Sequence, residues 1–307
     1  MLKVLLTGGS GMVGRNLLEH PGLCDFDLLA PTSREVDLRD GQALEAYMRA
    51  HRPDIVVHAA GRVGGIQANM REPVAFLTDN LGMGQNLLLS AQRAGVKRVI
   101  NLGSSCMYPR SRNEPLKEEW ILQGELEPTN EGYALAKIVT ARLGEYLMRE
   151  HPTFSCKTLV PCNLYGRYDK FDPRYSHLVP AIIHKMHVAL TQGQETVEIW
   201  GDGNARREFM YAGDLADALT QAIHRFDALP MTMNVGLGHD YTINEYYAAA
   251  ADVVGWHGRF LHDLIKPVGM ARKLVCIDRQ NAWGWRAQHN LRTGLERTYN
   301  YYLEQMQ

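Results

Sequence analysis

Short apolar runs alternate with amphipathic segments through the first half of the chain. The runs are apolar at nearly every position, as in strands buried on both faces, and lie at 3–8, 27–31, 54–61, 98–105 and 156–166. The segments between them repeat apolar residues at a helical period, as at 14–20, 41–51 and 80–95. This alternation predicts an α/β fold built on a doubly wound parallel sheet.

The pattern changes after about residue 167, where Pro, Gly and aromatic residues become more frequent and the elements shorter. One further strand is expected at 231–238, where the chain returns to the first domain. We therefore expect a first domain over 1–166 and a smaller C-terminal α/β domain that takes most of 167–307.

Composition excludes several classes of protein. The 307 residues carry a net charge of −1, so neither a nucleic-acid-binding surface nor a charged tail is indicated. The five cysteines are scattered without a C-x-x-C pair, which predicts neither a disulfide framework nor a metal site. No apolar run is long enough to span a membrane, and no secretory signal is expected. These features favour a cytoplasmic protein.

A glycine-rich turn follows the first predicted strand and precedes a helix. Gly8, Gly11 and Gly14 are spaced G-x-x-G-x-x-G, which allows a tight turn and a close approach of the backbone to a pyrophosphate. The free N–H groups of the following helix favour the same anion. This Rossmann-type arrangement predicts a dinucleotide site, although a plain strand–helix turn has the same signature when it stands alone.

The end of the second predicted strand favours NADP over NAD. An NAD site often has a carboxylate there to bind the ribose hydroxyls. Here Pro31 and two hydroxyl residues are followed by Arg34, whose cation suits a 2′-phosphate. Asp37 and Leu38 are expected at the adenine.

Tyr133 and Lys137 form a Y-x-x-x-K pair on one face of a predicted helix. An ammonium beside a phenol is expected to lower the pKa of the phenol, so that Tyr133 passes a proton to a carbonyl oxygen as hydride arrives. Ser104, at the end of an earlier strand, can hydrogen-bond that oxygen. Lys137 can also hold the nicotinamide ribose.

With these motifs in place, the chain resembles the extended short-chain dehydrogenase/reductase superfamily and, within it, the GDP-L-fucose synthase family. The resemblance runs over nearly the whole chain and rests on "RVGGIQAN", "LGSSCMYP", "LEPTNEGYALAK", "SHLVPAIIHK", "WGDGNARREFMYAGD" and "NVGLGHDYTI". It implies an NADPH-dependent enzyme that epimerises a GDP-4-keto-6-deoxy-hexose at carbons 3 and 5 and reduces the ketone at carbon 4, giving GDP-L-fucose. The first domain then binds the dinucleotide, and the second mainly the nucleotide sugar.

The resemblance assigns catalytic roles to Cys106 and His177. A thiolate suits removal of a proton beside the ketone, and an imidazole suits its return on the opposite face. Ser104, Tyr133 and Lys137 then serve both the enolate and the reduction. Free cysteine is otherwise usually a small core residue.

The resemblance also implies the binding sites. The cofactor is expected at Gly8, Gly9, Ser10, Gly11, Met12, Val13, Arg34, Asp37, Leu38, Ala60, Lys137, Pro161, Asn163, Leu164 and His177. The GDP sugar is expected at Lys185, Trp200, Arg207 and Arg272.

One segment departs from the family. The usual K-P-D-G-x-x-R-K-x-x-D is "KPVGMARKLVC" here, so Val268 and Cys276 replace two carboxylates. Such a carboxylate would accept hydrogen bonds from the substrate or orient Arg272, and its loss predicts a more tolerant sugar site.

Several alternatives therefore stay open. The enzyme could act on a related GDP sugar, as in GDP-L-colitose or GDP-6-deoxy-heptose synthesis, or perform only one of the two steps. A dinucleotide-binding regulator without chemistry is a third interpretation, which the intact catalytic residues disfavour. Family members usually form homodimers through two helices, for which the segments 80–95 and 132–148 are suitable.

Overall fold

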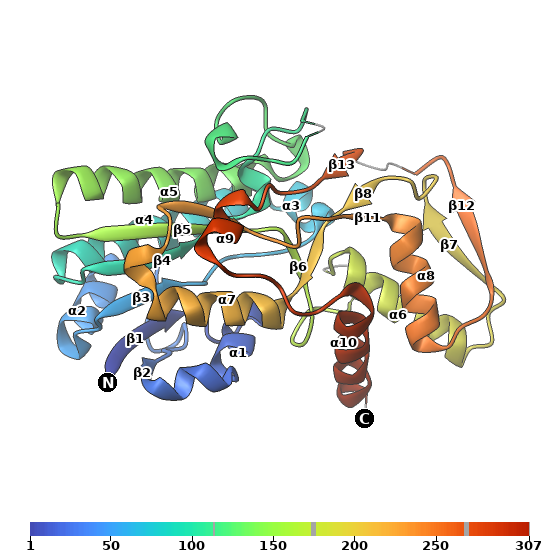
Figure 1. Ribbon diagram of the computed structural model, residues 1–307, viewed down its shortest axis with the longest axis horizontal. Coiled ribbons are helices and arrows are strands. Elements are labelled where there is room, and N and C mark those ends of the chain that lie inside the picture. Colours follow the sequence, from blue (N-terminus) through green and yellow to red (C-terminus); the bar gives the residue numbers. More distant parts are fainter. Residues whose placement is uncertain (113, 173–175, 267–269, 307) are drawn as a thin grey trace.

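A six-stranded, all-parallel sheet forms the centre of the first lobe in the computed structural model, which describes residues 1–112, 114–172, 176–266 and 270–306 (Figure 1). The strand order is β10-β5-β4-β3-β1-β2. The strands are β1 (Leu2–Thr7), β2 (Phe26–Leu29), β3 (Ile55–His58), β4 (Arg98–Leu102), β5 (Ser155–Pro161) and β10 (Thr232–Val235). The predicted doubly wound α/β fold is confirmed.

Helices cover both faces of this sheet. The helices α2 (Gly41–His51), α4 (Pro73–Arg93) and α5 (Glu131–Glu150) lie on one face, and α1 (Met12–Leu18) and α7 (Ala212–His224) lie on the other (Figure 1). Successive strand residues point to opposite faces, so Val56 packs with the α2–α4–α5 core while Val57 packs with the α1–α7 core. Burial on both faces is why these strands are apolar at nearly every position.

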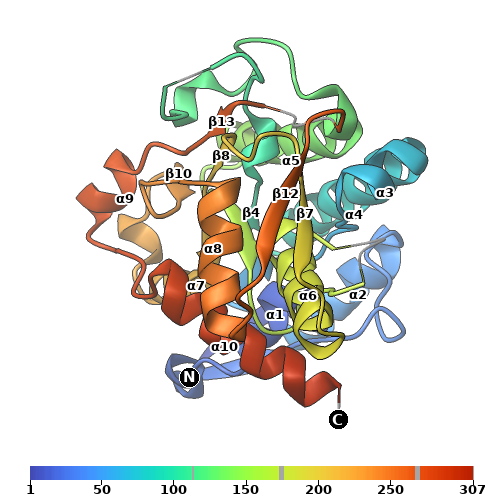
Figure 2. The same ribbon diagram turned by 90° about the vertical axis from the view of Figure 1, so that its right-hand side faces the viewer.

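The second lobe has its own core, built from three helices and short strands (Figure 2). Its helices are α6 (Leu178–Thr191), α8 (Ile243–Val254) and α10 (Leu291–Gln305), and β7 (Thr196–Trp200) pairs with β12 (Arg259–Asp263). A small sheet at the junction of the lobes has the order β11-β8-β13, from β8 (Arg206–Arg207), β11 (Tyr241–Thr242) and β13 (Arg272–Lys273). The remaining elements are β6 (Asn163–Tyr165), β9 (Phe209–Tyr211), α3 (Ile66–Arg71) and α9 (Asp278–Trp283).

The chain crosses between the lobes more often than the sequence indicated. After α6 and β7 it returns to the sheet as α7 and β10, enters the second lobe as α8, and packs α9 beside β10. The strand expected at 156–166 is in fact two strands: β5 stays in the main sheet, whereas β6 pairs with β9. The break lies at Cys162, whose N–H donates to Val235. No helix in the described part of the chain is long and apolar enough to cross a membrane.

Candidate active site

The candidate site lies at the carboxyl ends of β1, β3, β4 and β5, which point toward the second lobe (Figure 1). Ligands of open parallel sheets bind at this edge, because loops from neighbouring strands converge there. The loops after β1, β3 and β4 carry the glycine turn, Ala60 and Ser104 respectively.

The glycine turn forms a cradle that side chains would fill. Gly8 has a φ of +77°, and a Cβ there would lie 2.6 Å from the backbone nitrogen of Ala60. A Cβ on Gly14 would lie 2.2 Å from the carbonyl oxygen of Gly8, so α1 can pack this closely on the turn only with glycine. Gly11 is the N-cap of α1, which begins at Met12 and continues through Val13. The cradle therefore fits the pyrophosphate of a dinucleotide.

The residues expected at the adenine end of the cofactor lie in the loop after β2. Arg34 is exposed in the turn that follows this strand. The carboxylate of Asp37 is held by Arg39, at 2.7 Å from its Nη2, and these hydrogen bonds lower the pKa of Asp37 to about 2. The carbonyl oxygen of Leu38 accepts a hydrogen bond from Asn86. Because Arg39 is engaged by Asp37, the exposed Arg34 is the cation that this loop offers to a 2′-phosphate.

Lys137 is buried on α5 beside the ends of β3 and β4. Its Nζ donates to the carbonyl oxygen of Leu102 at 2.9 Å and lies 5.9 Å from the centre of the Tyr133 ring. Burial lowers the pKa of Lys137 to about 8. Burial lowers the pKa of the neighbouring His58 to about 3, and the positive charge of Lys137 lowers it further. The His58 imidazole is hydrogen-bonded to the Thr7 hydroxyl.

Tyr133 differs from the expectation in one respect. Its pKa is raised, first by burial and then by the charge of Cys106, while a side-chain hydrogen bond with Ser104 acts in the opposite direction. The prediction that Lys137 would bring this pKa below its usual value is therefore wrong, because burial raises the pKa of Tyr133. Desolvation outweighs an ammonium that is itself close to losing its proton. The phenol stays protonated, which is the form that can donate.

Cys106 follows Ser104 in a short 3₁₀ turn, and the Ser104 hydroxyl caps that turn by accepting from the Cys106 N–H at 3.2 Å. The half-buried thiol has two nitrogen donors beside it. The Nδ2 of Asn130 lies 3.1 Å from Sγ, and the Nζ of Lys273 lies 3.6 Å from it. An amide donor and a cation both favour negative charge on the sulfur.

Asn130 and Lys273 are site residues that the sequence analysis missed. Lys273 lies on the two-residue strand β13 beside Arg272, and neighbouring strand residues point to opposite faces. The sequence could not show which of the two faces the thiol. In the structure Lys273 does, whereas the Nε of Arg272 lies 2.5 Å from an Asp240 carboxylate oxygen and does not join the Cys106 cluster.

His177 lies at the N-cap of α6, half-buried. Its pKa is lowered by burial, and the nearby charges of Lys170 and Lys273 lower it further. Lys273 thus acts on both members of the predicted proton-transfer pair. The imidazole is mainly neutral at pH 7, and its protonated form is a stronger acid than an exposed histidine.

The other predicted substrate residues lie in the second lobe or at its edge. Arg207 is mostly buried on β8, where burial lowers its pKa, and its Nη1 donates to the Arg206 carbonyl. Lys185 on α6 donates to the Glu198 carbonyl at 2.8 Å and lies beside Tyr247. Trp200 ends β7 and is 46% exposed, so its indole ring is available for stacking.

The remaining cofactor residues are at the junction of the lobes. Pro161 ends β5, Leu164 packs on the first-lobe core, and the side-chain amide of Asn163 donates to the Glu208 carbonyl at 3.0 Å.

Of the two departures from the family pattern, the structure describes only Cys276. Val268 lies outside the described residues. Cys276 donates its N–H to Leu116, and its carbonyl accepts from Asn234, away from Cys106. In this chain Arg272 is oriented by the carboxylate of Asp240, and the expectation of a more tolerant sugar site stays a prediction.

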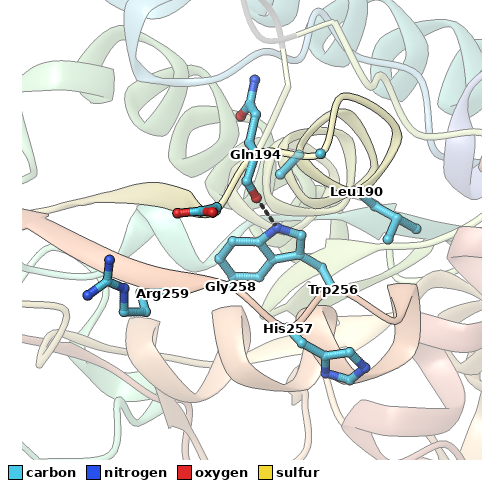
Figure 3. A pocket seen from close by; sticks show the side chains of 9 residues that line it. Leu190, Gln194, Trp256, His257, Gly258 and Arg259 are labelled. Carbon is cyan, nitrogen blue, oxygen red and sulfur yellow. Dashed lines mark hydrogen bonds between the residues drawn. The ribbon is translucent and has the colours of Figure 1, made fainter.

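Two hollows in the described part of the molecule bear on where chemistry could occur. One of about 230 Å³ lies directly beside the site and is lined by Asn69, Phe76, Asn130 and Tyr133, among others. The other, of about 420 Å³, lies between the C-terminal end of α6 and the segment leading into β12 (Figure 3). Trp256 lies at its centre and donates to the Gln194 carbonyl, and none of the predicted site residues lines it. The hollow beside Tyr133 is therefore the one relevant to chemistry.

Comparison with known proteins agrees with this geometry. Residues 4–236 match the NAD dependent epimerase/dehydratase family. The chain is 50% identical to a GDP-L-colitose synthase from Yersinia pseudotuberculosis, covering 99% of both chains. It is 51% identical to a GDP-L-fucose synthase from Azorhizobium caulinodans, covering 98% of this chain and 96% of the relative. Among solved structures, a GDP-mannoheptose C4 reductase from Campylobacter jejuni with NADP bound is 29% identical, with a TM-score of 0.88 over 98% of each chain.

Proposed function

This chain belongs to the NAD dependent epimerase/dehydratase family, and on that premise we propose that it is an NADPH-dependent epimerase/reductase of a GDP-4-keto-6-deoxy-hexose. The proposal is supported by relatives of about 50% identity that are named for GDP-L-fucose and GDP-L-colitose synthesis. It is also supported by the glycine cradle, which fits a dinucleotide. When bound, NADPH supplies a hydride for the ketone carbon.

The residues around Lys137 serve the reduction. Tyr133 is protonated, and Ser104 is near enough to act on its pKa, so the two hydroxyl groups can hold one carbonyl oxygen between them. As hydride arrives, Tyr133 donates its proton to that oxygen. Lys137 is held at Leu102 O and stabilises the phenolate that results, although it does not ionise the phenol beforehand.

The residues around Cys106 serve proton exchange at the carbons beside the ketone. The thiolate removes a proton from one face, and the electron pair moves into an enolate whose oxygen is held by Tyr133 and Ser104. The protonated form of His177 delivers a proton to the opposite face; its lowered pKa makes each transfer easier, although it leaves a smaller fraction of His177 protonated at pH 7. Two such events invert carbons 3 and 5.

One observation carries the epimerase half of the proposal: Sγ of Cys106 lies 3.1 Å from an Asn130 amide nitrogen and 3.6 Å from the Lys273 ammonium. A reductase that only transferred hydride would need Tyr133 and Lys137 but no polarised thiol beside them. A regulator without chemistry would need neither.

Two GDP sugars are the leading substrates, because the fucose and colitose relatives are equally similar to this chain. GDP-4-keto-6-deoxy-mannose requires inversion at carbons 3 and 5. In its 3-deoxy analogue, carbon 3 carries no hydroxyl to invert. We propose the first substrate, on which the proton-transfer pair would act at two carbons, and keep the 3-deoxy sugar, which still needs inversion at carbon 5, as the alternative.

The test is incubation with GDP-4-keto-6-deoxy-mannose and NADPH in D₂O, followed by NMR of the product, with the 3-deoxy analogue in parallel. We expect deuterium at carbons 3 and 5 and cofactor-derived hydrogen at carbon 4. Reduction without deuterium would remove the epimerase half. Cofactor binding without turnover of either sugar would favour the regulator instead. A clear preference for the 3-deoxy analogue would assign colitose synthesis.

We further propose that the protein is a homodimer through α4 and α5. These helices pack against each other, and α5 exposes Leu135, Val139 and Tyr146 on its outer side, with Val74 exposed on α4. Such a row of apolar side chains is typical of a buried interface.

A further inference from the structure

Glu208 is a buried carboxylate that the proposed chemistry does not use. It lies between β8 and β9, one residue after Arg207, and is 1% exposed. Its Oε1 accepts from the backbone N–H groups of Leu237, at 2.6 Å, and Gly238, at 2.9 Å. Its Oε2 accepts from the N–H of Val275 at 2.9 Å. Three backbone donors therefore converge on one side chain.

These bonds join segments that are far apart in the sequence. Leu237 and Gly238 lie in the loop after β10, which belongs to the main sheet, whereas Val275 lies two residues after Lys273 on the chain leaving β13. The backbone N–H of Glu208 also donates to the Lys273 carbonyl at 3.2 Å. The chain at and just beyond Lys273 is thus attached to Glu208 twice, once through its backbone and once through its carboxylate.

Lys273 depends on this attachment because β13 is short. The strand has two residues and pairs with β8 along one edge. On its other face, Arg206 and Arg272 are both paired with Asp240, which holds the sheet together but does not control the chain beyond Lys273. The chain beyond Lys273 is held by backbone hydrogen bonds of Leu116 with Leu274 and Cys276, and by the carboxylate of Glu208 at Val275. Glu208 also donates its own N–H to the Lys273 carbonyl, so it holds the chain both at Lys273 and just beyond it.

We propose that Glu208 is a positioning residue for proton exchange: by holding the backbone around Lys273 through Val275, it places the Lys273 ammonium at the Cys106 thiol. The effect of Glu208 on turnover rests on the proposed function. The placement of Lys273 at Cys106 by Glu208 does not, and it can be tested without substrate.

A carboxylate is required because the three backbone groups that contact its oxygens are all donors. A glutamine in place of Glu208 would offer one oxygen and one NH₂ group. In either orientation the NH₂ would face backbone N–H groups, that of Val275 or those of Leu237 and Gly238, so that two hydrogen-bond donors would oppose each other. Burial raises the pKa of Glu208 to about 7, against the opposing effect of the three N–H donors, and Asp240 raises it further. The experiments are therefore best run at about pH 8, where the carboxylate is mostly ionised.

The first readout needs no substrate. Alkylation of Cys106 by iodoacetamide, followed by peptide mass spectrometry to separate it from the other cysteines, reports on the environment of the thiol. We expect Glu208→Gln to slow this alkylation about tenfold, because a displaced ammonium stabilises less thiolate. The matched control is Asp214→Asn, because Asp214 is a similarly buried carboxylate that accepts from the backbone of Gln288 and His289, remote from the thiol. It should leave the Cys106 rate unchanged.

The second readout is a double-mutant cycle with Lys273→Met. If Glu208 acts through Lys273, then Glu208→Gln adds no further loss to Lys273→Met, in alkylation or in deuterium exchange into the substrate with NADP⁺ bound. Additive losses, or an unchanged alkylation rate in Glu208→Gln, would overturn the proposal. If Glu208→Gln does not fold, the same cycle is run with Glu208→Asp.

The two proposals fail in different ways. A parent protein that exchanges no deuterium with either GDP sugar contradicts the proposed function, while the alkylation cycle still decides the role of Glu208. A parent that exchanges normally, with Glu208→Gln equal to it, contradicts the role of Glu208 alone.

Discussion

Replacing Lys137 by methionine should abolish reduction and at the same time stabilise the protein at neutral pH. Lys137 is 6% exposed, and its ammonium donates to the Leu102 carbonyl. Methionine has a similar length and no charge, so it can fill the space without the cost of burying an ammonium. A residue that is needed for activity but destabilises the fold is expected to behave in this way.

The magnitude follows from the pKa. Burial lowers the pKa of Lys137 from 10.5 to about 8, which corresponds to ~3 kcal/mol of destabilisation when the ammonium is charged at pH 7. Loss of the hydrogen bond to Leu102 offsets about 1–2 kcal/mol of that gain. The net expectation is stabilisation of Lys137→Met by ~1–2 kcal/mol at pH 7. The pKa of Lys137 is lower in the folded state than in the unfolded state, so the parent gains stability as the pH rises. Its destabilisation by the buried ammonium decreases from about pH 8 upward and is absent above pH 10.5.

The assay is urea unfolding of parent and variant at pH 7 and near pH 10.5, with NADPH oxidation measured beside it. The variant should be the more stable at pH 7 and the less stable at the higher pH, where only the lost hydrogen bond remains. Lys97→Met is the control, since Lys97 is exposed and should show neither effect. A variant that keeps activity, or that is destabilised equally at both pH values, would refute the reasoning.

Three further predictions concern other parts of the molecule. Tyr133→Phe should lose most reduction while binding NADPH as tightly as the parent, measured by fluorescence titration, because only the proton donor is removed; an active variant would contradict its role. Arg34→Ala should weaken the binding of NADPH by about 2 kcal/mol, roughly thirtyfold in affinity, as expected for a charged hydrogen bond, and should leave the binding of NADH unchanged. Equal affinities of the parent for both cofactors would show that Arg34 does not bind the 2′-phosphate. Tyr146→Glu should convert a dimer into a monomer in light scattering, since it places a charge in the expected interface; a parent that is already monomeric removes the dimer proposal.

Local pattern was sufficient for the first lobe. The apolar strands, the glycine turn and the Y-x-x-x-K pair each depend on residues close in sequence, and their geometry follows from backbone periodicity. The glycines of the turn are a clear case: the positive φ at Gly8 and the close contact at Gly14 both occur within one strand–turn–helix unit.

What the sequence did not show involves elements too short to carry a pattern and contacts between distant residues. In the two-residue strand β13, the facing side is set by pairing with β8, so Lys273 and not Arg272 reaches the thiol. Likewise, the residue that orients Arg272 is Asp240, which is 32 positions away. The pKa of Tyr133 was misjudged for a related reason, since desolvation depends on the whole surrounding core and not on the neighbour four residues later.

The sequence by itself therefore determined the main sheet and the glycine turn, because hydrophobic period and turn geometry are local properties of the chain, and its resemblance to a family supplied the proposed reacting groups. Only the tertiary structure decided what surrounds those groups. Asn130 and Lys273 reach Cys106 from 24 and 167 residues away, and Glu208 holds the chain beyond Lys273 from 67 residues before Val275. Such contacts depend on how the two lobes pack against each other, because the chain passes between them more than once. The environment of the thiol is a property of that packing.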